Sequence, residues 1–346
     1  MDILHSTRPA PVSGLEDVPF PSVDAKAPLA LLKRCPVAAE TPLSRVESLA
    51  KAAGVGGVWI KDERGRMGLG SFKALGAAYV IAHDAQSENA NGATYVTASA
   101  GNHGMSVAAG AAAFGAHAVI YIAETVPEAF ADRLAQQGAV VVREGTTYEA
   151  SMAAAAQAAE TKGWRLLSDS SWDGYMEYPH RVMEGYLALM AEAVDQMPQA
   201  PSHIFLQAGV GGLAGSCAAL ARQVWGNGPR IIVVEPAFAA ALYDSVKAGA
   251  PRQSSGPLSN MGRLDCKMPS LIALKGLARD ADDFALITEA EAEAGAGTAM
   301  VAGFASTPSG VAGIAGLLAA SEAQRGALGL DKNARVLCVL SEGPEA

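Results

Sequence analysis

The sequence predicts an α/β protein in which parallel-rich sheets, flanked by helices, form two lobes. The first observation is an alternation of β-branched segments with alanine-rich helical segments, over residues 58–142 and again over residues 203–340. Such alternation is typical of parallel sheets covered by helices. The second observation is the composition, because half of the residues are hydrophobic while aromatic residues make up only 6%. Abundant alanine and glycine suit close packing of helices on sheets.

The first alternating unit follows an irregular start. Residues 1–40 are rich in proline, so we expect no regular structure there. A helix is predicted next, with Thr41 as N-cap, Pro42 in the first turn and Gly54 as its C-terminal stop. Beyond it we predict strands at 58–61, 93–97, 118–122 and 139–142, and helices at 72–83, 103–114 and 127–137.

A long helix at residues 179–196 is predicted to separate this unit from a second one. Two sheet-containing units of this kind predict two lobes with a cleft between them. In the second unit we predict strands at 203–207, 230–234 and 335–340, and helices at 213–224 and 310–324.

The pentapeptide AGVGG occurs twice, at Ala53 and at Ala208. The first copy follows a predicted helix and precedes a strand, so we interpret it as a helix-ending turn. The second copy follows a strand and opens a helix, as anion-binding turns do. Only the second copy is therefore a candidate functional site.

Charge and cysteine content argue against several classes of protein. The net charge is −9 without a basic cluster, which argues against a nucleic-acid surface. The four cysteines are far apart and form no CxxC pair, so zinc and redox motifs are unsupported and a reducing compartment is expected. The N-terminus does not resemble a signal peptide, and no segment is predicted to span a membrane. We expect a soluble cytoplasmic protein.

Lys73 is the first candidate for chemistry. It follows Gly70, Ser71 and Phe72 at the start of a predicted helix and is surrounded by small apolar residues. A lysine most often lies on a solvated face, which is the alternative here. Confinement instead lowers the pKa of an amine and makes it a better nucleophile towards an aldehyde.

Two turns between a strand and a helix are candidate anion sites. In the segment 97–104, TASAGNHG, small residues allow backbone N–H groups to approach an anion. Asn102 can hydrogen-bond a phenolic oxygen, and His103 is either a base or a helix-start contact; the alternative is a purely structural turn. The segment 207–216, QAGVGGLAGS, lacks a Walker lysine and predicts a phosphate held by backbone amides. A dinucleotide-binding turn is the alternative, since Glu235 lies near the required spacing.

Taken in order, these motifs resemble the fold-type II pyridoxal-phosphate (PLP) enzymes, the tryptophan synthase β-like family, over nearly the whole chain. The matching motifs are GSFK at Lys73, SAGNHG at Ser99, AGVGGLAG at Ala208 and LSEG at Leu340. The resemblance implies that Lys73 carries PLP as a Schiff base in the cleft between the lobes. It also implies that Asn102 contacts the ring hydroxyl and Ser341 the pyridine nitrogen. The implied phosphate-binding residues are Gly209, Val210, Gly211, Gly212 and Leu213, and the implied substrate-carboxylate site is Ser99, Ala100, Gly101, Asn102 and His103.

The same resemblance implies a division of the chain. Residues 1–80 and 190–346 are expected to form the larger, PLP-binding lobe, and residues 81–189 the smaller lobe on the substrate side. A homodimer is also implied. A neutral Ser341 at the ring nitrogen weakens the electron sink, so elimination is favoured over transamination.

Within the family, the segment 168–197 is similar to the ammonia-lyases that act on 2,3-diaminopropionate. Asp169 then matches an acid associated with the L-substrate, with a strand-end cap as the alternative. Trp172, Tyr175 and Tyr178 either line the substrate side or make core or subunit contacts. Ala100 departs from the lyase pattern, which has an aspartate before GNHG, and makes this loop resemble that of serine and threonine dehydratases.

The predicted function is α,β-elimination on a β-substituted α-amino acid, giving a 2-oxo acid and ammonia, with Lys73 and Asp169 as the catalytic residues. The alternatives are a serine/threonine-type dehydratase or a racemase on the same scaffold, and a non-catalytic phospholigand-binding protein. A metal site seen in racemase-like members is not expected, because Ala241 stands where a second acid beside Glu235 would be needed.

Overall fold

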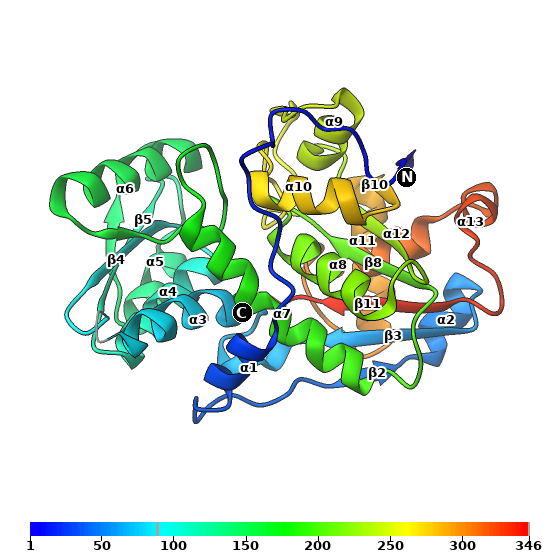
Figure 1. Ribbon diagram of the computed structural model, residues 1–346, viewed down its shortest axis with the longest axis horizontal. Helices are drawn as coiled ribbons and strands as arrows, with labels where there is room; N and C mark the ends of the chain where they lie inside the picture. The colour runs from blue at the N-terminus through cyan, green and yellow to red at the C-terminus, as the bar shows by residue number, and fades with distance from the viewer. Residues whose placement is uncertain (88–89, 345–346) are drawn as a thin grey trace.

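The computed structural model describes residues 1–87 and 90–344 and contains two sheets, each at the centre of its own lobe (Figure 1). The larger sheet has seven strands in the order β1-β10-β9-β8-β11-β3-β2, and the smaller has four in the order β6-β5-β4-β7. The α/β fold class predicted from the sequence is confirmed. Helix α7 (Glu177–Gln196) packs against helices of both lobes and crosses between them in Figure 1.

The larger sheet is parallel except at its two edges. The antiparallel edge strands β1 and β2 pair with β10 and β3 respectively. Side chains alternate between the two faces of each strand, so two separate cores form: α7, α8 and α10 cover one face, and α2, α11 and α12 the other. The strands are β1 (Asp2–His5), β2 (Leu43–Arg45), β3 (Gly57–Asp62), β8 (His203–Gln207), β9 (Arg230–Pro236), β10 (Asp283–Ile287) and β11 (Arg335–Leu340).

The smaller sheet is entirely parallel. Its strands are β4 (Thr94–Ala98), β5 (His117–Ile122), β6 (Val140–Arg143) and β7 (Arg165–Leu166). Helices α4 (Asn102–Ala113) and α5 (Glu128–Gln136) cover one face, and α6 (Tyr148–Lys162) covers the other. All four strands fall inside residues 81–189, whereas α3 (Lys73–Gln86), which packs against α4, begins earlier.

The N-terminal expectations were partly wrong. Strand β1 and helix α1 (Lys26–Leu32) lie in the region expected to be irregular. The helix predicted from Thr41 is replaced by β2, because Leu43 pairs with Lys61 of β3, and helix α2 (Glu47–Ala53) begins only afterwards. Its predicted end is confirmed, since Gly54 adopts the left-handed conformation with φ 62°.

Five elements outside the N-terminal region were missed: α6, α9 (Ala241–Ala248), α10 (Leu271–Asp280), β10 and α11 (Glu289–Val301). The single helix predicted at 310–324 is two helices, α12 (Ala312–Ala319) and α13 (Glu322–Leu328). The break occurs because the Ser321 side chain accepts a hydrogen bond from the backbone N–H of Gln324 and so starts a new helix. None of the helices in residues 1–87 and 90–344 combines the length and the apolar character that a bilayer crossing needs.

Candidate active site

Lys73 is the first residue of α3 and follows the segment 63–72, which connects β3 to this helix. Its ammonium group forms an ion pair with the carboxylate of Asp169, which lies in the loop after β7. The rings of Phe72 and Tyr186 lie beside the ammonium group, with centroids 5.3 and 5.8 Å from it. The structure therefore brings both predicted catalytic residues into direct contact.

The expected lowering of the Lys73 pKa is wrong for this arrangement. Burial is the largest single influence and lowers it, but the charge and hydrogen bond of Asp169, together with Tyr186 and Cys266, outweigh burial and raise the pKa above the ordinary value of lysine. Conversely, burial acts to raise the pKa of Asp169, but Lys73 holds it well below its usual range. The sequence motif around Lys73 carries no sign of this carboxylate, which is far away along the chain.

The SAGNHG loop joins β4 to α4. Gly101 is the N-cap of α4 and provides no side-chain hydrogen bond to the helix. The first N–H groups of α4 have no acceptors within the helix and suit an anion. The loop is held from both sides: the Ser99 N–H donates to the Tyr121 carbonyl over 3.1 Å, and the Asn102 side-chain amide donates to Glu342.

Of the two roles considered for His103, a base or a contact at the start of a helix, the structure shows the second. The Nε2 atom of His103 bonds the carbonyl oxygen of Leu167 over 2.8 Å, which ties α4 to the segment between β7 and Asp169. Burial lowers the pKa of His103, so the neutral ring is favoured. We assign it no proton-transfer step.

The glycine-rich turn connects β8 to α8 (Gly212–Trp225). Gly211 adopts φ 100°, and a Cβ there would lie 3.0 Å from the side chains of Ala273 and Leu242, so glycine is required. As N-cap of α8 it offers no side-chain hydrogen bond, which leaves the first-turn N–H groups for a phosphate. The ring of Tyr186, beside Lys73, lies 3.6 Å from a Cβ built on Gly212. The turn and Lys73 thus share a neighbour, and the residues present fit PLP.

Ser341 and Glu342 complete the cluster at the end of β11. The Phe72 N–H donates to the Ser341 carbonyl over 3.0 Å, so Ser341 lies directly beside the start of α3. The carboxylate of Glu342 is nearly buried and accepts hydrogen bonds from Asn102 and Thr307. All four motifs therefore meet in one place.

The other candidate residues make contacts within the protein. Trp172 stacks on Tyr175 with ring centroids 4.3 Å apart, and the Tyr175 hydroxyl donates to the Leu166 carbonyl over 2.7 Å. The Tyr178 hydroxyl donates to Asp84. Glu235 accepts the first backbone N–H groups of α9, from Leu242 and Tyr243, each over 2.8 Å.

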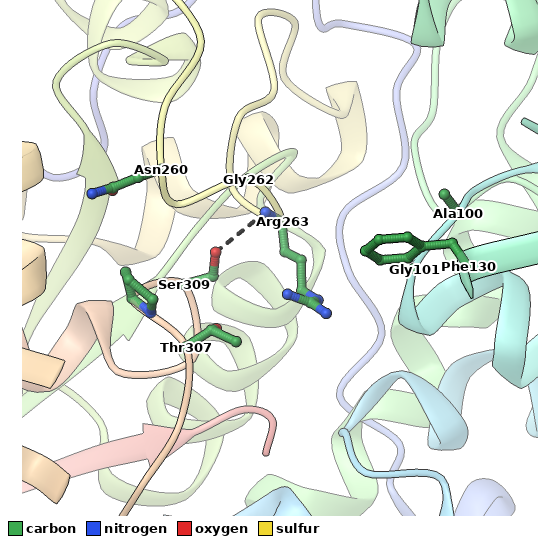
Figure 2. Close-up of a pocket in the computed structure, with 9 residues that line it drawn as sticks. Ala100, Gly101, Phe130, Asn260, Gly262, Arg263, Thr307 and Ser309 are labelled. Carbon is green, nitrogen blue, oxygen red and sulfur yellow. Dashed lines mark hydrogen bonds between the residues drawn. The ribbon is translucent and has the colours of Figure 1, made fainter. Parts of the chain in front are cut away.

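The sequence motifs did not point to a cavity of 490 Å³ next to the SAGNHG loop (Figure 2). Tyr148 was also missed: it is half exposed, yet burial of its hydroxyl and the charge of Asp169 raise the pKa of this phenol. Only Ala100 and Gly101 of the cavity lining belong to a sequence motif; its other residues and Tyr148 come from segments outside the motifs. The cavity is lined by Ala100, Gly101, Phe130, Asn260, Gly262, Arg263, Thr307, Pro308 and Ser309.

A cleft that combines a lysine, a glycine-rich turn at a helix start and a serine is suited to a PLP-dependent enzyme. The family model "Pyridoxal-phosphate dependent enzyme" matches residues 36–342, and the chain belongs to this family. Its enzyme class and its cofactor are thereby confirmed.

Among curated relatives, the diaminopropionate ammonia-lyase of Salmonella typhimurium is 35% identical over 71% of this chain and 68% of its own length. The corresponding protein of Escherichia coli K12 is 33% identical over 70% of this chain and 67% of its own length. The L-threonine dehydratase of Pasteurella multocida is 32% identical, but over only 62% of this chain and 39% of its own length. These names support the resemblance found in the sequence.

Solved structures agree. The diaminopropionate ammonia-lyase of Escherichia coli, in complex with an aminoacrylate-PLP azomethine reaction intermediate, superposes with a TM-score of 0.88 at 29% identity. The match covers 99% of this chain and 93% of that one. The two-lobed architecture is therefore that of fold-type II PLP enzymes.

Proposed function

We propose that the protein is a PLP-dependent ammonia-lyase that eliminates the β-substituent of an α-amino acid and releases a 2-oxo acid and ammonia. The observation that carries this proposal is the ion pair of Lys73 with Asp169, in a cleft where two anion-binding turns converge. Relatives at 33–35% identity that are named diaminopropionate ammonia-lyases support it.

The cofactor would be held by residues from both lobes. Lys73 is the proposed attachment point, and Gly209, Val210, Gly211, Gly212 and Leu213 bind the phosphate. Asn102 bonds the ring hydroxyl, and Ser341 offers a neutral hydroxyl to the ring nitrogen. When bound, PLP supplies an electron-accepting ring system that stabilises negative charge at the substrate Cα.

The substrate would be oriented by its carboxylate. Backbone N–H groups of residues 99–103 receive it at the start of α4, where the helix dipole favours an anion. This places Cα towards Lys73 and Asp169.

Asp169 is the proposed base. Lys73 keeps it ionised at neutral pH, so it can accept the Cα proton; the amine of Lys73 is the competing candidate. The two enantiomers present this proton to opposite faces, and the SAGNHG loop has Ala100 rather than an acid. We therefore expect a strong preference for L-substrates.

The test uses purified PLP-loaded enzyme and the L- and D-forms of 2,3-diaminopropionate, serine and threonine. Release of ammonia and 2-oxo acid from L-substrates, with much slower release from D-substrates, is expected. No 2-oxo acid from any member of the panel would refute the proposal.

A second candidate is a serine/threonine-type dehydratase or racemase. Ala100 favours it, because the loop then matches the dehydratase pattern, and the threonine dehydratase relatives are consistent with it. The panel separates the two, since a dehydratase prefers serine or threonine and a racemase interconverts enantiomers without releasing ammonia.

The proposal also covers the division into lobes, the oligomeric state and the cellular compartment. Residues 1–80 and 190–346 form the lobe that binds PLP and residues 81–189 the substrate-side lobe, which the position of the two sheets supports. The enzyme is a cytoplasmic homodimer. The free thiols of Cys35, Cys217, Cys266 and Cys338 are consistent with a reducing compartment.

A further inference from the structure

Glu342 follows Ser341 in the LSEG motif and has a carboxylate that the proposed mechanism does not use. This carboxylate is nearly buried and accepts hydrogen bonds from the Asn102 amide and the Thr307 hydroxyl. It also forms an ion pair with Arg263, with 2.9 Å between the two atoms. Thr307 and Arg263 line the larger-lobe wall of the cavity (Figure 2), whereas Asn102 begins α4 in the smaller lobe. The carboxylate therefore connects the two lobes at the site proposed for the cofactor.

The backbone of Glu342 is fixed relative to the segment that carries Lys73. Glu342 forms an antiparallel bridge with Ser71, two residues before the lysine. The next residue, Gly343, donates its N–H to the Gly70 carbonyl over 2.9 Å. Because these contacts determine where the carboxylate lies, they also determine where the Asn102 amide is held.

The contact with Glu342 selects one orientation of the Asn102 amide. A carboxylate paired with an arginine only accepts hydrogen bonds, so it takes the amide nitrogen of Asn102 and not the amide oxygen. This nitrogen carries two N–H groups. One of them donates to Glu342, and the other is left for a second acceptor. An amide without such a partner could instead turn its oxygen towards that acceptor.

We propose that Glu342 is a positioning residue that keeps the second N–H of Asn102 directed at the ring hydroxyl of PLP. The inference rests on the proposed function, which places this hydroxyl at Asn102. An N–H donor stabilises negative charge on the ring oxygen. The hydroxyl proton therefore moves more readily from that oxygen to the nitrogen that links PLP to Lys73. Glu342 acts only through Asn102 and transfers no proton.

The absorption spectrum of the PLP-loaded protein tests this inference without turnover. PLP attached to a lysine absorbs in the visible when the proton is on the nitrogen and in the near ultraviolet when it is on the ring oxygen. Glu342→Gln keeps the size of the side chain, but its amide donates as well as accepts, so Asn102 loses its fixed orientation. We expect the ratio of visible to near-ultraviolet absorbance to fall at least about threefold, as the loss of one hydrogen bond predicts.

A double-mutant cycle shows whether Glu342 acts through Asn102. Asn102→Ala removes the donor itself and should lower the same ratio at least as much. Adding Glu342→Gln to Asn102→Ala should then change the ratio no further. Glu289→Gln is the matched control, because it makes the same chemical change in a carboxylate that accepts the Asn260 N–H, over 2.6 Å, in a loop lining the same cavity. It should leave the spectrum unchanged.

The variants are arranged so that a folding defect does not decide the result. Glu342→Gln leaves Arg263 without its carboxylate partner. If this variant folds poorly, Glu342→Gln combined with Arg263→Gln removes both charges together and takes its place. Its spectrum is then compared with that of Arg263→Gln, in which Glu342 still accepts from Asn102.

A wild-type spectrum in folded Glu342→Gln overturns the inference, even if urea unfolding shows a loss of stability, because Glu342 would then be purely structural. A further fall of the ratio on adding Glu342→Gln to Asn102→Ala also overturns it, since Glu342 would act independently of Asn102. Failure of the proposed function gives a different result. The wild type would bind PLP with the expected spectrum but release no 2-oxo acid from any substrate, and the spectral comparison would still decide the inference.

Discussion

Two lysines, Lys61 and Lys73, differ both in what surrounds them and in how deeply they are buried. The Lys61 ammonium is fully buried and donates to the Thr41 carbonyl over 2.6 Å, to Glu192 over 2.7 Å and to Gln196 over 3.1 Å. Lys73 is about a fifth exposed, faces the cleft and pairs with Asp169. One amine has all three of its donors occupied, and the other lies where a ligand can reach it.

A criterion based on the pKa alone would select Lys61 rather than Lys73, the lysine proposed to hold PLP. Burial lowers the pKa of Lys61, with Glu192 acting against it, whereas Asp169 raises that of Lys73. A lowered pKa is commonly associated with a nucleophilic lysine. Yet Lys61 belongs to a closed network in which Arg66 pairs with Glu63 and Glu192, and all four charged side chains are buried. Access and the neighbouring anion sites distinguish a functional lysine from a structural one.

The largest expected effects separate these two lysines. Lys73→Ala should lower turnover by about 10³ or more, and it should cost less folding stability than Lys61→Met, because the Asp169 carboxylate left without its cation is 16% exposed whereas Glu192 is 3% exposed. Lys61→Met should instead cost roughly 3–5 kcal/mol of stability, because Glu192 loses one of its cations in a buried site. Any remaining folded Lys61→Met should turn over substrate at close to the wild-type rate.

Urea unfolding of the cofactor-free proteins measures the stabilities, since bound PLP would stabilise only those variants that bind it. Borohydride reduction of the PLP-loaded wild type should attach the cofactor to the peptide that contains Lys73. A label on Lys61, or full activity of Lys73→Ala, would reverse the comparison.

The second prediction changes Asp169, the ion-pair partner of Lys73, to asparagine. The amide keeps the shape but cannot accept a proton, so turnover of L-substrates should fall by about 10² while the absorption spectrum of the bound cofactor persists. Asp173→Asn, at an exposed aspartate in the same loop, is the matched control and should be silent. Full activity of Asp169→Asn would make Lys73 the base, and equal wild-type turnover of D- and L-forms would remove the argument from Ala100.

Local motifs made the fold and the cofactor site predictable. Strands such as β9 and β5 are short runs rich in β-branched residues, and Lys73, Gly211 and Ser341 lie within contiguous motifs at the ends of elements. What the sequence did not reveal depends on contacts between distant segments. The pKa of Lys73 depends on Asp169, the strand β2 pairs with β3, and Arg263 lines a cavity formed by three separate loops and helix α5.

The third prediction concerns the glycine-rich turn proposed to bind phosphate, which lies near Lys73 but not near Lys61. Gly211→Asp places a carboxylate where backbone N–H groups are proposed to meet the phosphate, at a position with φ 100° and side chains 3.0 Å from the new Cβ. PLP affinity should fall at least about tenfold, or about 1.4 kcal/mol. Equilibrium titration with PLP measures this, with Gly326→Asp as control because nothing lies within 4 Å of a Cβ there. Wild-type affinity in folded Gly211→Asp would move the phosphate site elsewhere.

The last prediction compares these lysines with Glu235, a buried acid that accepts hydrogen bonds from backbone N–H groups rather than from a cationic side chain. Burial raises its pKa to about 8, although hydrogen bonds from the backbone N–H groups of Leu242 and Tyr243 act in the opposite direction. A raised folded-state pKa means that the stabilising contribution is fully present below the ordinary value of 4.5 and is lost as pH rises towards 8. At pH 5 Glu235→Gln should cost only about 1 kcal/mol, because one of the two N–H groups loses its acceptor.

Between pH 5 and pH 8 the wild type should lose stability relative to Glu235→Gln, by at most about 1.4 kcal/mol per pH unit. Urea unfolding of both cofactor-free proteins at several pH values measures this difference. The opposite trend, in which Glu235→Gln becomes progressively less stable than the wild type as pH rises, would show that the two backbone N–H groups hold Glu235 ionised. Hydrogen bonds from a helix start would then do for this acid what Glu192 does for Lys61, and a buried charge would need donors or acceptors around it rather than an opposite charge.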